Sequence, residues 1–398
     1  MSFLTLDQAN VTHQNVLLRL DLNLPFSHGA VTDNTRITRS LPTINALVAR
    51  QAKVIILSHF GRPRDIKDVQ YSLKPIAEHL QQFVDCPVIF AADCISDMAE
   101  KAIADAPFGS IIVLENLRFY KEEEQNDVLF AKKLADLGQL YVNDAFSCVH
   151  RAHASIVGIC SHLPSYAGHA LQQELQALQS VLETPKKPVM AIVGGSKVSS
   201  KIDLLQNLLT QVDYLVIGGG MANTFLAAQA IEVGNSLCED EYIPTAQEIL
   251  MAAEDHNCEI VLPIDVVVTN VIVPNSEFKI SSIDRIGSMQ KIADIGPKSV
   301  SRICHFMDQC QTLVWNGPVG VFEVEPFDQG SILLGQHIAA LTKENKIMSV
   351  AGGGDTLAAL AKAGVEDDFT YTSTAGGAFL EWLEGKQLPG IVALQKQR

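Results

Sequence analysis

Residues 188–201 read PVMAIVGGSKVSSK, an apolar run followed by two glycines and a polar segment with two lysines. A short apolar run closed by glycine is typical of a strand that is covered on both faces of a parallel sheet. The glycine turn lets the chain bend directly into a helix. Similar runs recur on both sides of this stretch, each followed by a polar or glycine-rich turn and a helical pattern. The sequence therefore predicts βα units on parallel sheets.

These runs fall into two groups, one in each half of the chain. They are 16–20, 53–57, 111–114 and 140–142 in the first half, and 188–193, 214–217, 259–262, 312–315, 346–351 and 369–372 in the second. Each group contains enough predicted strands for one doubly wound domain.

A helix is predicted between the two groups. Leu171, Leu175, Leu178, Val181 and Leu182 recur at helical spacing before Pro185 and Pro188. We interpret this segment as a helix that bridges two domains. The alternative is a crossover helix inside one large sheet, although ten strands would exceed the usual sheet size.

The predicted domain boundaries follow from this pattern. They are 1–170 for the first domain, 171–188 for the linking helix and hinge, 189–378 for the second domain, and 379–398 for a closing segment. The closing segment ends in LPGIVALQKQR, which is too apolar for a loose tail. We expect it to pack against folded structure.

Composition excludes several classes of partner. The chain has 398 residues, 45 of them acidic and 30 basic, with a formal net charge of −15. Such a balance repels nucleic acid and anionic lipid, so neither is expected as a partner. Residues 152–173 and 214–231 lack formal charge over the length of a membrane span, but their histidines, glycines and amides are costly in lipid. No membrane span is predicted.

The N-terminal residues and the cysteines indicate a cytoplasmic protein. The first ten residues, MSFLTLDQAN, lack the basic and apolar segments of a signal peptide. The eight cysteines include no CxxC pair, which predicts free buried thiols. The acidic run 121–124 is interpreted as a solvated start of a helix.

Cationic side chains follow four successive predicted strands of the first half. Because ligands bind beyond the carboxyl ends of parallel strands, these side chains are expected to lie together. Arg binds phosphate and carboxylate through a planar fork of donors, so an anion pocket is predicted, although a single strand-end Arg is more often a surface ion pair. The polar residues at these ends are Arg19, Asp21, Asn23, Ser58, His59, Arg62, Glu115, Asn116, Arg118, Asn143, Asp144, His150, Arg151 and His153, with Arg36 in a following loop.

Glycine dominates the corresponding positions of the second half. The turns are GGSKVSSK from residue 194, GGGMANT from 218, WNGPVG from 315 and GGGDT from 352. Glycine lets main-chain N–H groups approach a ligand closely, which favours a nucleotide with its phosphates. Lys197 and Lys201 add positive charge, and Asp355 is a candidate magnesium carboxylate.

Two familiar glycine motifs are missing from the chain. The absence of GxxxxGK[ST] excludes a P-loop, and the absence of GxGxxG weakens a nicotinamide-binding interpretation. An anion site that faces a nucleotide site implies phosphoryl transfer across a cleft.

These segments resemble the phosphoglycerate kinase family, in the family's order and over almost the whole chain. The matching blocks are RLDLNLP (19–25), DNTRI (33–37), SHFGRP (58–63), ENLRF (115–119), VNDAFSCVHRAHAS (142–155), GGSKVSSK (194–201), GGGMANTF (218–225), DIGPKS (294–299), VWNGPVGVFE (314–323), GGGDT (352–356) and STAGGAFLEWLEGKQLPG (373–390). The resemblance implies two Rossmann-like lobes joined by a helix, with the C-terminal segment returning to the first lobe, and a monomer.

The resemblance also implies a reaction: reversible transfer of the acyl phosphate of 1,3-bisphosphoglycerate to Mg²⁺-bound ADP, which yields 3-phosphoglycerate and ATP. It assigns the glycerate and its phosphate to Asp21, Asn23, Arg36, His59, Arg62, Arg118 and Arg151. It assigns the nucleotide to Gly194, Lys197, Lys201, Gly218, Asn316, Glu323, Gly353, Gly354, Asp355 and Thr356, with Asp355 as the metal ligand. Arg36, Lys197, Gly376 and Gly377 would act on the migrating phosphoryl group.

Elementary chemistry agrees with this assignment. A phosphoglycerate carboxylate is already ionised at neutral pH, since carboxyl groups titrate near pH 4, so its attack on a phosphate needs no general base. What remains is alignment and charge neutralisation of a loose transition state. Ligands held on two lobes must also be brought together and shielded from water, which predicts a hinge at or near 171–188. The alternative is a rigid bridge with bending at other loops.

Two positions depart from the family's pattern. Ala375 replaces the first of three glycines, and a methyl there would cost about 1 kcal/mol if the backbone needed positive φ. Leu22 replaces an aromatic residue, without evident chemical consequence.

Two other functions remain open at this point: a nicotinamide-dependent dehydrogenase, and a two-lobed protein that binds a metabolite without chemistry.

Overall fold

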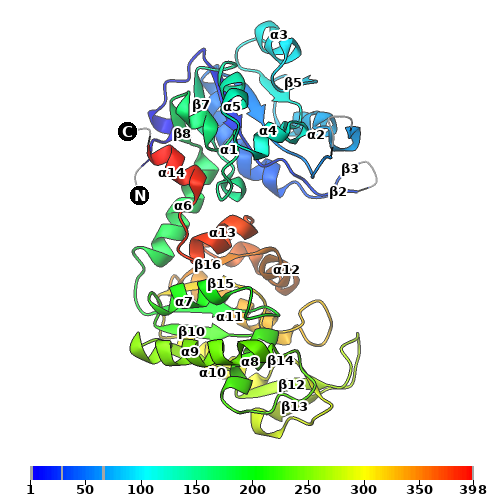
Figure 1. The fold of residues 1–398 in the computed structure, drawn as a ribbon, viewed down its shortest axis with the longest axis vertical. Coiled ribbons are helices and arrows are strands. Elements are labelled where there is room, and N and C mark those ends of the chain that lie inside the picture. The colour runs from blue at the N-terminus through cyan, green and yellow to red at the C-terminus, as the bar shows by residue number, and fades with distance from the viewer. Residues whose placement is uncertain (1–2, 28–29, 65–67, 397–398) are drawn as a thin grey trace. The chain divides into compact units, whose positions relative to one another are not determined.

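The computed structural model describes residues 3–27, 30–64 and 68–396 (Figure 1). The chain divides into two compact units. The first unit comprises Met1–Leu175 and Gln387–Arg398, and the second comprises Gln176–Lys386. Each unit is built around its own six-stranded parallel sheet.

The sheet of the first unit has the order β5-β6-β4-β1-β7-β8, and every neighbouring pair is parallel. Its central strands are buried along their whole length, as their apolar sequences predict. The strands are β1 (Asn15–Arg19), β4 (Lys53–Leu57), β5 (Val88–Ala91), β6 (Ile111–Leu114), β7 (Leu140–Asn143) and β8 (Ser165–Ala167), with a hairpin of β2 (Phe26–Ser27) and β3 (Ala30–Val31). The helices are α1 (Thr35–Ala49), α2 (Lys74–Leu80), α3 (Asp97–Asp105), α4 (Lys121–Glu124), α5 (Val128–Ala135) and α14 (Pro389–Gln395), with 3₁₀ turns that include η4 (Leu117–Phe119), η5 (Phe146–Cys148) and η6 (Gly158–Ser161).

The main sheet of the second unit has the order β11-β10-β9-β15-β16-β17, again entirely parallel. Its core includes the fully buried Trp315, which packs with Ile303 and Leu334 from flanking helices. The strands are β9 (Val189–Val193), β10 (Tyr214–Ile217), β11 (Glu259–Val261), β15 (Thr312–Asn316), β16 (Met348–Gly352) and β17 (Tyr371–Ser373). The helices are α7 (Ile202–Leu209), α8 (Gly220–Ala228), α9 (Ile243–Asp255), α10 (Pro297–Met307), α11 (Gln329–Lys343), α12 (Gly354–Ala363) and α13 (Gly376–Leu383).

All ten predicted runs coincide with strands to within two residues at their ends. The two separate sheets exclude one large sheet, and the predicted class of two doubly wound parallel-sheet domains is confirmed. The segment at 171–182 is helical, since α6 spans His169–Leu182. The division between the two units falls within this helix, after Leu175.

Several strands were not predicted. A three-stranded antiparallel sheet, with the order β13-β12-β14, belongs to the second unit (Figure 1). It consists of β12 (Asp265–Thr269), β13 (Lys279–Ser282) and β14 (Lys291–Ile295). Strand β13 is polar and exposed, and therefore lacks an apolar signal. The edge strands β5 and β8 were not predicted either, and β5 is only partly buried over most of its length.

Each parallel sheet has one point where the strand order reverses. In the first unit it lies between β1 and β7, and in the second between β9 and β15. Adjacent connections leave such a point in opposite directions, which opens a crevice beyond the carboxyl ends of the strands. The candidate site residues of both units follow these strands.

The C-terminal helix packs on the first unit. Helix α14 lies beside β8, although the two are far apart in sequence (Figure 1). The Gly390 N–H donates to the Val149 carbonyl at 2.9 Å, and a Cβ at Gly390 would collide with Val149 and Ile156. Glycine thus permits the close approach.

Among the described residues, no helix combines the length and apolar character that a bilayer crossing requires.

Candidate active site

In the first unit, cationic side chains converge from several elements. Arg19 ends β1, His59 follows β4 and Arg118 lies in η4 after β6. Arg151 follows η5, and Arg36 is the second residue of α1. The parallel sheet explains this gathering, because the carboxyl ends of its strands lie along one edge.

Asp21 organises the loop after β1. One of its carboxylate oxygens accepts from the Arg36 guanidinium at 3.1 Å and from the Asn23 N–H at 3.1 Å, and the other accepts from the Ser147 hydroxyl. Arg36 also donates to the Asn23 carbonyl at 2.6 Å. The Gly61 N–H donates to the Asn23 side-chain oxygen at 2.8 Å. Three predicted substrate residues therefore form one bonded cluster.

Two of the predicted cations are tethered to their surroundings. Arg118 donates to the Gly61 carbonyl at 2.8 Å and pairs with Glu124 at 3.1 Å. The Arg151 Nε–H donates to His150 at 3.2 Å. Arg62, by contrast, is exposed.

The electrostatics of this region are those of an anion site. Burial first, and then the neighbouring guanidinium groups, hold the pKa of His59 well below its usual value. Burial likewise lowers the pKa of Arg118, with a further contribution from Arg151. Cations that destabilise one another's charge form a surface that a bound anion would neutralise.

Asp21, His59 and Cys148 place one potential ligand atom each within 4.8 Å of the others. The donor set does not fit a metal ion. Arg19 donates to His59 at 3.2 Å and to the Cys148 sulfur at 3.7 Å, so a guanidinium occupies the space that a metal cation would need. Burial also raises the pKa of Cys148, which keeps its thiol protonated.

Glu123 differs from the sequence interpretation. The run 121–124 was predicted to be solvated, but the Glu123 side chain is fully buried. Its carboxylate accepts from the Ser155 hydroxyl at 2.6 Å and from the Ser155 N–H at 2.9 Å. The prediction was wrong because the binding partners lie 32 residues further along the chain.

In the second unit, glycines permit close contact between β9 and β15. The Gly194 N–H donates to the Asn316 carbonyl at 3.0 Å. A Cβ at Gly194 would collide with the Gly317 and Pro318 carbonyl oxygens. Gly317 has φ +97°, a conformation that L side chains rarely adopt. Gly218 likewise abuts Val319.

Lys201 ties the same two strand ends together. Its ammonium donates to the Gly194 carbonyl at 2.7 Å, to the Asn316 side-chain oxygen at 2.6 Å and to the Asn316 carbonyl at 3.2 Å. Burial lowers the pKa of Lys201 to about 8. The Asn316 amide donates in turn to the Gly352 carbonyl at 2.9 Å. Both predicted nucleotide residues thus also hold the loops.

The N-termini of α12 and α13 lie next to each other. Gly353 precedes α12 with φ +99°, and its Cα is 4.0 Å from an ideal Cβ on Gly376, the first residue of α13. An added Cβ on Gly354 would meet nothing within 4 Å. Two helix N-termini present free N–H groups and positive dipole ends, which suit phosphate oxygens. Gly377 lies in the same first turn of α13.

Two further residues complete this region. The Thr356 hydroxyl donates to the Gly352 carbonyl at 2.9 Å and accepts from the Gly317 N–H at 2.7 Å. Ala375 has φ −95°. Because this φ is negative, the position does not need a left-handed backbone, and the cost considered for a methyl there does not arise.

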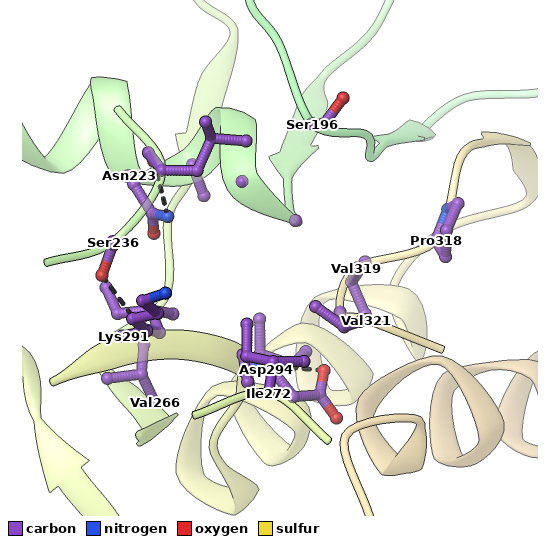
Figure 2. A pocket seen from close by; sticks show the side chains of 18 of the residues that line it. Ser196, Asn223, Ser236, Val266, Ile272, Lys291, Asp294, Pro318, Val319 and Val321 are labelled. Carbon is purple, nitrogen blue, oxygen red and sulfur yellow. Dashed lines mark hydrogen bonds between the residues drawn. The ribbon is translucent and has the colours of Figure 1, made fainter. Parts of the chain in front are cut away.

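A cavity of about 560 Å³ opens beside these turns (Figure 2). Glu323 and Asp355 line it, together with Ser196, Gly219 and Val319. The buried Asp294 lines it as well, and burial raises the pKa of Asp294 to about 8. The volume of this cavity falls in the range of pockets that hold a small-molecule ligand.

Sequence reasoning missed Glu239, which supports the loop that carries Lys197. The Ser199 N–H and hydroxyl donate to the Glu239 carboxylate at 3.0 and 2.6 Å. Burial opposes ionisation, yet these bonds and the charge of Lys197 lower the pKa of Glu239. Lys197 itself is exposed. Glu239 follows no predicted strand and belongs to no glycine turn, so no sequence signal marks it.

The predicted site residues separate cleanly by unit. Those assigned to phosphoglycerate lie in the first unit, and those assigned to the nucleotide lie in the second. Among the strand-end candidates, Asn116 is buried and bonded to the Phe60 and Tyr71 carbonyls, which makes it a structural residue.

Comparison with known proteins agrees with this arrangement. The phosphoglycerate kinase family profile matches residues 6–386. A phosphoglycerate kinase of Rhodopseudomonas palustris is 55% identical over 394 residues, which cover 99% of each chain. The solved phosphoglycerate kinase of Coxiella burnetii matches with a TM-score of 0.92 and 42% identity, covering 99% of each chain. That of Pyrococcus horikoshii matches with a TM-score of 0.83 and 30% identity, again over 99% of each.

The fold, the two sites and these matches define a phosphotransferase with a carboxyl group as acceptor. They do not support a nicotinamide-dependent dehydrogenase or a non-catalytic binding protein. The chain belongs to the phosphoglycerate kinase family.

Proposed function

We propose that this chain catalyses reversible transfer of the acyl phosphate of 1,3-bisphosphoglycerate to Mg²⁺-bound ADP, giving 3-phosphoglycerate and ATP. One observation carries the proposal. Each unit has candidate site residues beside its own reversal of strand order, guanidinium groups in the first and glycine turns beside a cavity in the second. A phosphorylated acid and a nucleotide are the ligands that such sites suit.

The first unit binds the phosphoglycerate in this proposal. His59, Arg62, Arg118 and Arg151 grip the phosphate that is not transferred, and Asp21 with Asn23 orients the glycerate. Arg36 approaches the migrating group. The bonded cluster of Asp21, Asn23 and Arg36 supports this division, because it fixes one guanidinium beside the two residues that would orient the glycerate.

The second unit binds the nucleotide. Glu323 holds the ribose hydroxyls in the cavity, and Lys201, Asn316 and the glycine turns surround the phosphates. Asp355 fits a magnesium ion, because this residue lines the cavity and carboxylate oxygen is a ligand that Mg²⁺ prefers. When bound, Mg²⁺ neutralises phosphate charge. Thr356 supports the same turn through its hydroxyl.

The chemical step needs positioning and charge rather than a base. The substrate carboxylate is ionised at neutral pH and attacks the phosphorus directly. Lys197, Arg36 and the N–H groups of Gly376 and Gly377 would stabilise the spreading charge of the migrating group. Lys197 is exposed in a loop braced by Glu239, which leaves its ammonium available for this task.

Transfer also requires the two ligands to meet with water excluded, otherwise the acyl phosphate hydrolyses. We therefore propose that the units close on each other around the segment 171–188, in which the division between them falls. The family resemblance implies a monomer, and we propose that state for this chain. All eight cysteines are free, which suits a reducing, cytoplasmic compartment.

A coupled assay tests the proposed function. ATP consumption should require 3-phosphoglycerate, Mg²⁺ and the enzyme together. Consumption that proceeds without 3-phosphoglycerate would contradict the proposal. So would tight binding of one ligand with no turnover, which is the behaviour of a binding protein.

A further inference from the structure

Arg19 is fully enclosed, although its position at the end of β1 predicts contact with a ligand. Its exposed fraction is 1%. The Nε–H donates to the Ser155 hydroxyl at 2.9 Å, and one terminal nitrogen donates to the Leu20 carbonyl. The other terminal nitrogen lies 3.2 Å from His59 Nδ1 and 3.7 Å from the Cys148 sulfur. Every nitrogen of the guanidinium is thus committed to the protein.

The contact with His59 has only one chemical interpretation. A guanidinium carries donors and no acceptor, and it stays charged at any pH that proteins tolerate. The nitrogen that receives its hydrogen bond must therefore be unprotonated. A neutral imidazole has one N–H, which then sits on Nε2.

A buried counter-charge holds Arg19 in this orientation. The Ser155 hydroxyl accepts from Arg19 and donates to the Glu123 carboxylate at 2.6 Å. Glu123 is fully buried and also accepts from the Ser155 N–H. A buried carboxylate that reaches a buried guanidinium through one hydroxyl fixes the guanidinium in place.

We propose that Arg19 is a positioning residue that sets His59 as the neutral imidazole with its proton on Nε2, so that His59 offers one N–H donor to the bound phosphoglycerate. The role of His59 as a ligand-binding residue rests on the proposed function. The state of the ring does not, because it follows from the Arg19 contact alone.

The charges around His59 act in the same direction. Burial and the guanidinium groups of Arg19, Arg118, Arg36 and Arg151, in that order, lower the pKa of His59. These four guanidinium groups come from β1, η4, α1 and the segment after η5. The opposing acids nearby are Asp21, which is bonded to Arg36, and the Cys148 thiol, which is protonated. If the His59 ring were protonated, its positive charge would lie against that of Arg19.

This arrangement separates two tasks in the anion site. The guanidinium groups supply charge that does not change with pH. His59 orients the ligand, because a single N–H on a fixed ring can donate to a phosphate oxygen in only one position. Loss of that orientation should weaken binding without altering its dependence on pH.

Nitrogen-15 NMR of the full-length chain with labelled histidine tests the state of the ring directly. The His59 signal is assigned by its loss in His59→Gln. We expect the pattern of a neutral ring protonated at Nε2 throughout about pH 6 to 8. An imidazolium, or a ring protonated at Nδ1, at about pH 6.5 would overturn the proposal. The measurement needs no substrate, so it stands apart from the kinase assay.

A matched pair of variants tests the donor. The amide nitrogen of Gln reaches the place of Nε2, whereas that of Asn reaches the place of Nδ1. His59→Gln should therefore bind 3-phosphoglycerate about tenfold more tightly than His59→Asn, the worth of one hydrogen bond to a charged group. Equal losses in the two variants would contradict the proposal.

The pH profile distinguishes a neutral His59 donor from a cationic one. The ratio of the 3-phosphoglycerate KM of His59→Gln to that of the wild type should stay constant between about pH 6 and 8. If His59 bound as a cation, the ratio would fall up to tenfold per pH unit above its pKa. Taking a ratio cancels the titration of the substrate phosphate.

Removing Arg19 tests the positioning itself. Arg19→Met is combined with Glu123→Gln, so that no buried carboxylate is left without its counter-charge. In the double variant His59 should populate both tautomers and titrate closer to its ordinary pKa of about 6.5. An unchanged His59 spectrum would overturn the role of Arg19. If the double variant does not fold, the wild-type spectrum still decides the state of the His59 ring.

Discussion

At the scale of single residues, Lys201 shows how a strand-end lysine serves the fold and a ligand together. Its three donors meet three acceptors on Gly194 and Asn316. The ammonium charge nevertheless stays within the region proposed for the nucleotide phosphates. Deprotonation would therefore weaken the proposed phosphate site.

The pKa of Lys201, which burial lowers to about 8, makes nucleotide binding sensitive to alkaline pH. The amine loses its proton as pH rises through that value and then has two N–H donors for three acceptors. The KM for ATP should rise above about pH 8, while that for 3-phosphoglycerate should not follow the same curve. A flat KM for ATP up to about pH 9.5 in steady-state kinetics would contradict this.

The same shift affects stability with a definite sign. The folded pKa lies below the unfolded value of 10.5, so the unfolded chain binds more protons between the two values. Unfolding free energy should thus gain from this group as pH rises from about 8 to about 10.5, by at most about 1.4 kcal/mol per pH unit. Lys201→Met should lack that gain in denaturant titrations.

Lys197 is expected to act on the transition state rather than on binding. Lys197→Ala should lower kcat about a thousandfold or more, with little change in KM for either ligand. The exposed Lys101 on α3 provides a control, since Lys101→Ala should leave kcat unchanged. A rise in KM alone for Lys197→Ala would mean that the lysine only binds.

How far single residues can be predicted depends on the distance to their partners. Arg36, His59 and Asp355 follow from strand ends and glycine turns, which are local patterns. The inward direction of Arg19 depends on Ser155, which lies 136 residues away. Glu123 and Glu239 depend on partners that lie 32 and 40 residues away, so no local pattern shows that they brace the sites.

At the scale of elements, the glycine turns divide into two kinds. Gly194 and Gly317 are needed for packing, because a Cβ at either would collide with backbone. Gly354 faces open space at the first turn of α12. The first kind builds the turn, and the second leaves room at a helix N-terminus where a phosphate is proposed to bind.

A matched pair of substitutions distinguishes the two kinds. Gly194→Ala should destabilise the second unit by about 3 kcal/mol, because the colliding atoms are carbonyl oxygens with little freedom to move. Gly354→Ala should leave thermal stability unchanged or slightly higher, and should raise the KM for ATP. Differential scanning calorimetry and kinetics measure the two effects. Equal losses of stability would contradict this division.

Element prediction succeeded where strands are buried and parallel. Such strands are continuous apolar runs that end in polar or glycine turns, and ten of the twelve parallel strands that the structure describes were predicted. Strand β13 was missed because its residues are largely exposed, and β5 because it is only partly buried. Their pairing is set by neighbours in the fold rather than by their own pattern.

At the scale of the whole molecule, the chain leaves the first unit through α6 and returns to it with α14. Residues Gln387–Arg398 belong to the first unit although the second precedes them in sequence. Ile391 and Leu394 of α14 are buried. The first unit is therefore incomplete without the C-terminal segment.

Truncation after Lys386 should destabilise the first unit selectively. We expect amide hydrogen exchange around Val149 and β8 to rise at least tenfold, while exchange in β9 and β15 stays unchanged. Lys396→Ala, at an exposed position, serves as the control. Equal effects on both units, or none, would contradict the assignment of α14.

The central claim is that acid and nucleotide bind on different units of one chain. A crystal structure with 3-phosphoglycerate and a non-hydrolysable Mg²⁺–ATP analogue tests it most directly. The account predicts the phosphoglycerate against Arg62, Arg118 and Arg151, and the nucleotide in the cavity lined by Glu323 and Asp355. Both ligands bound within the same unit would contradict it.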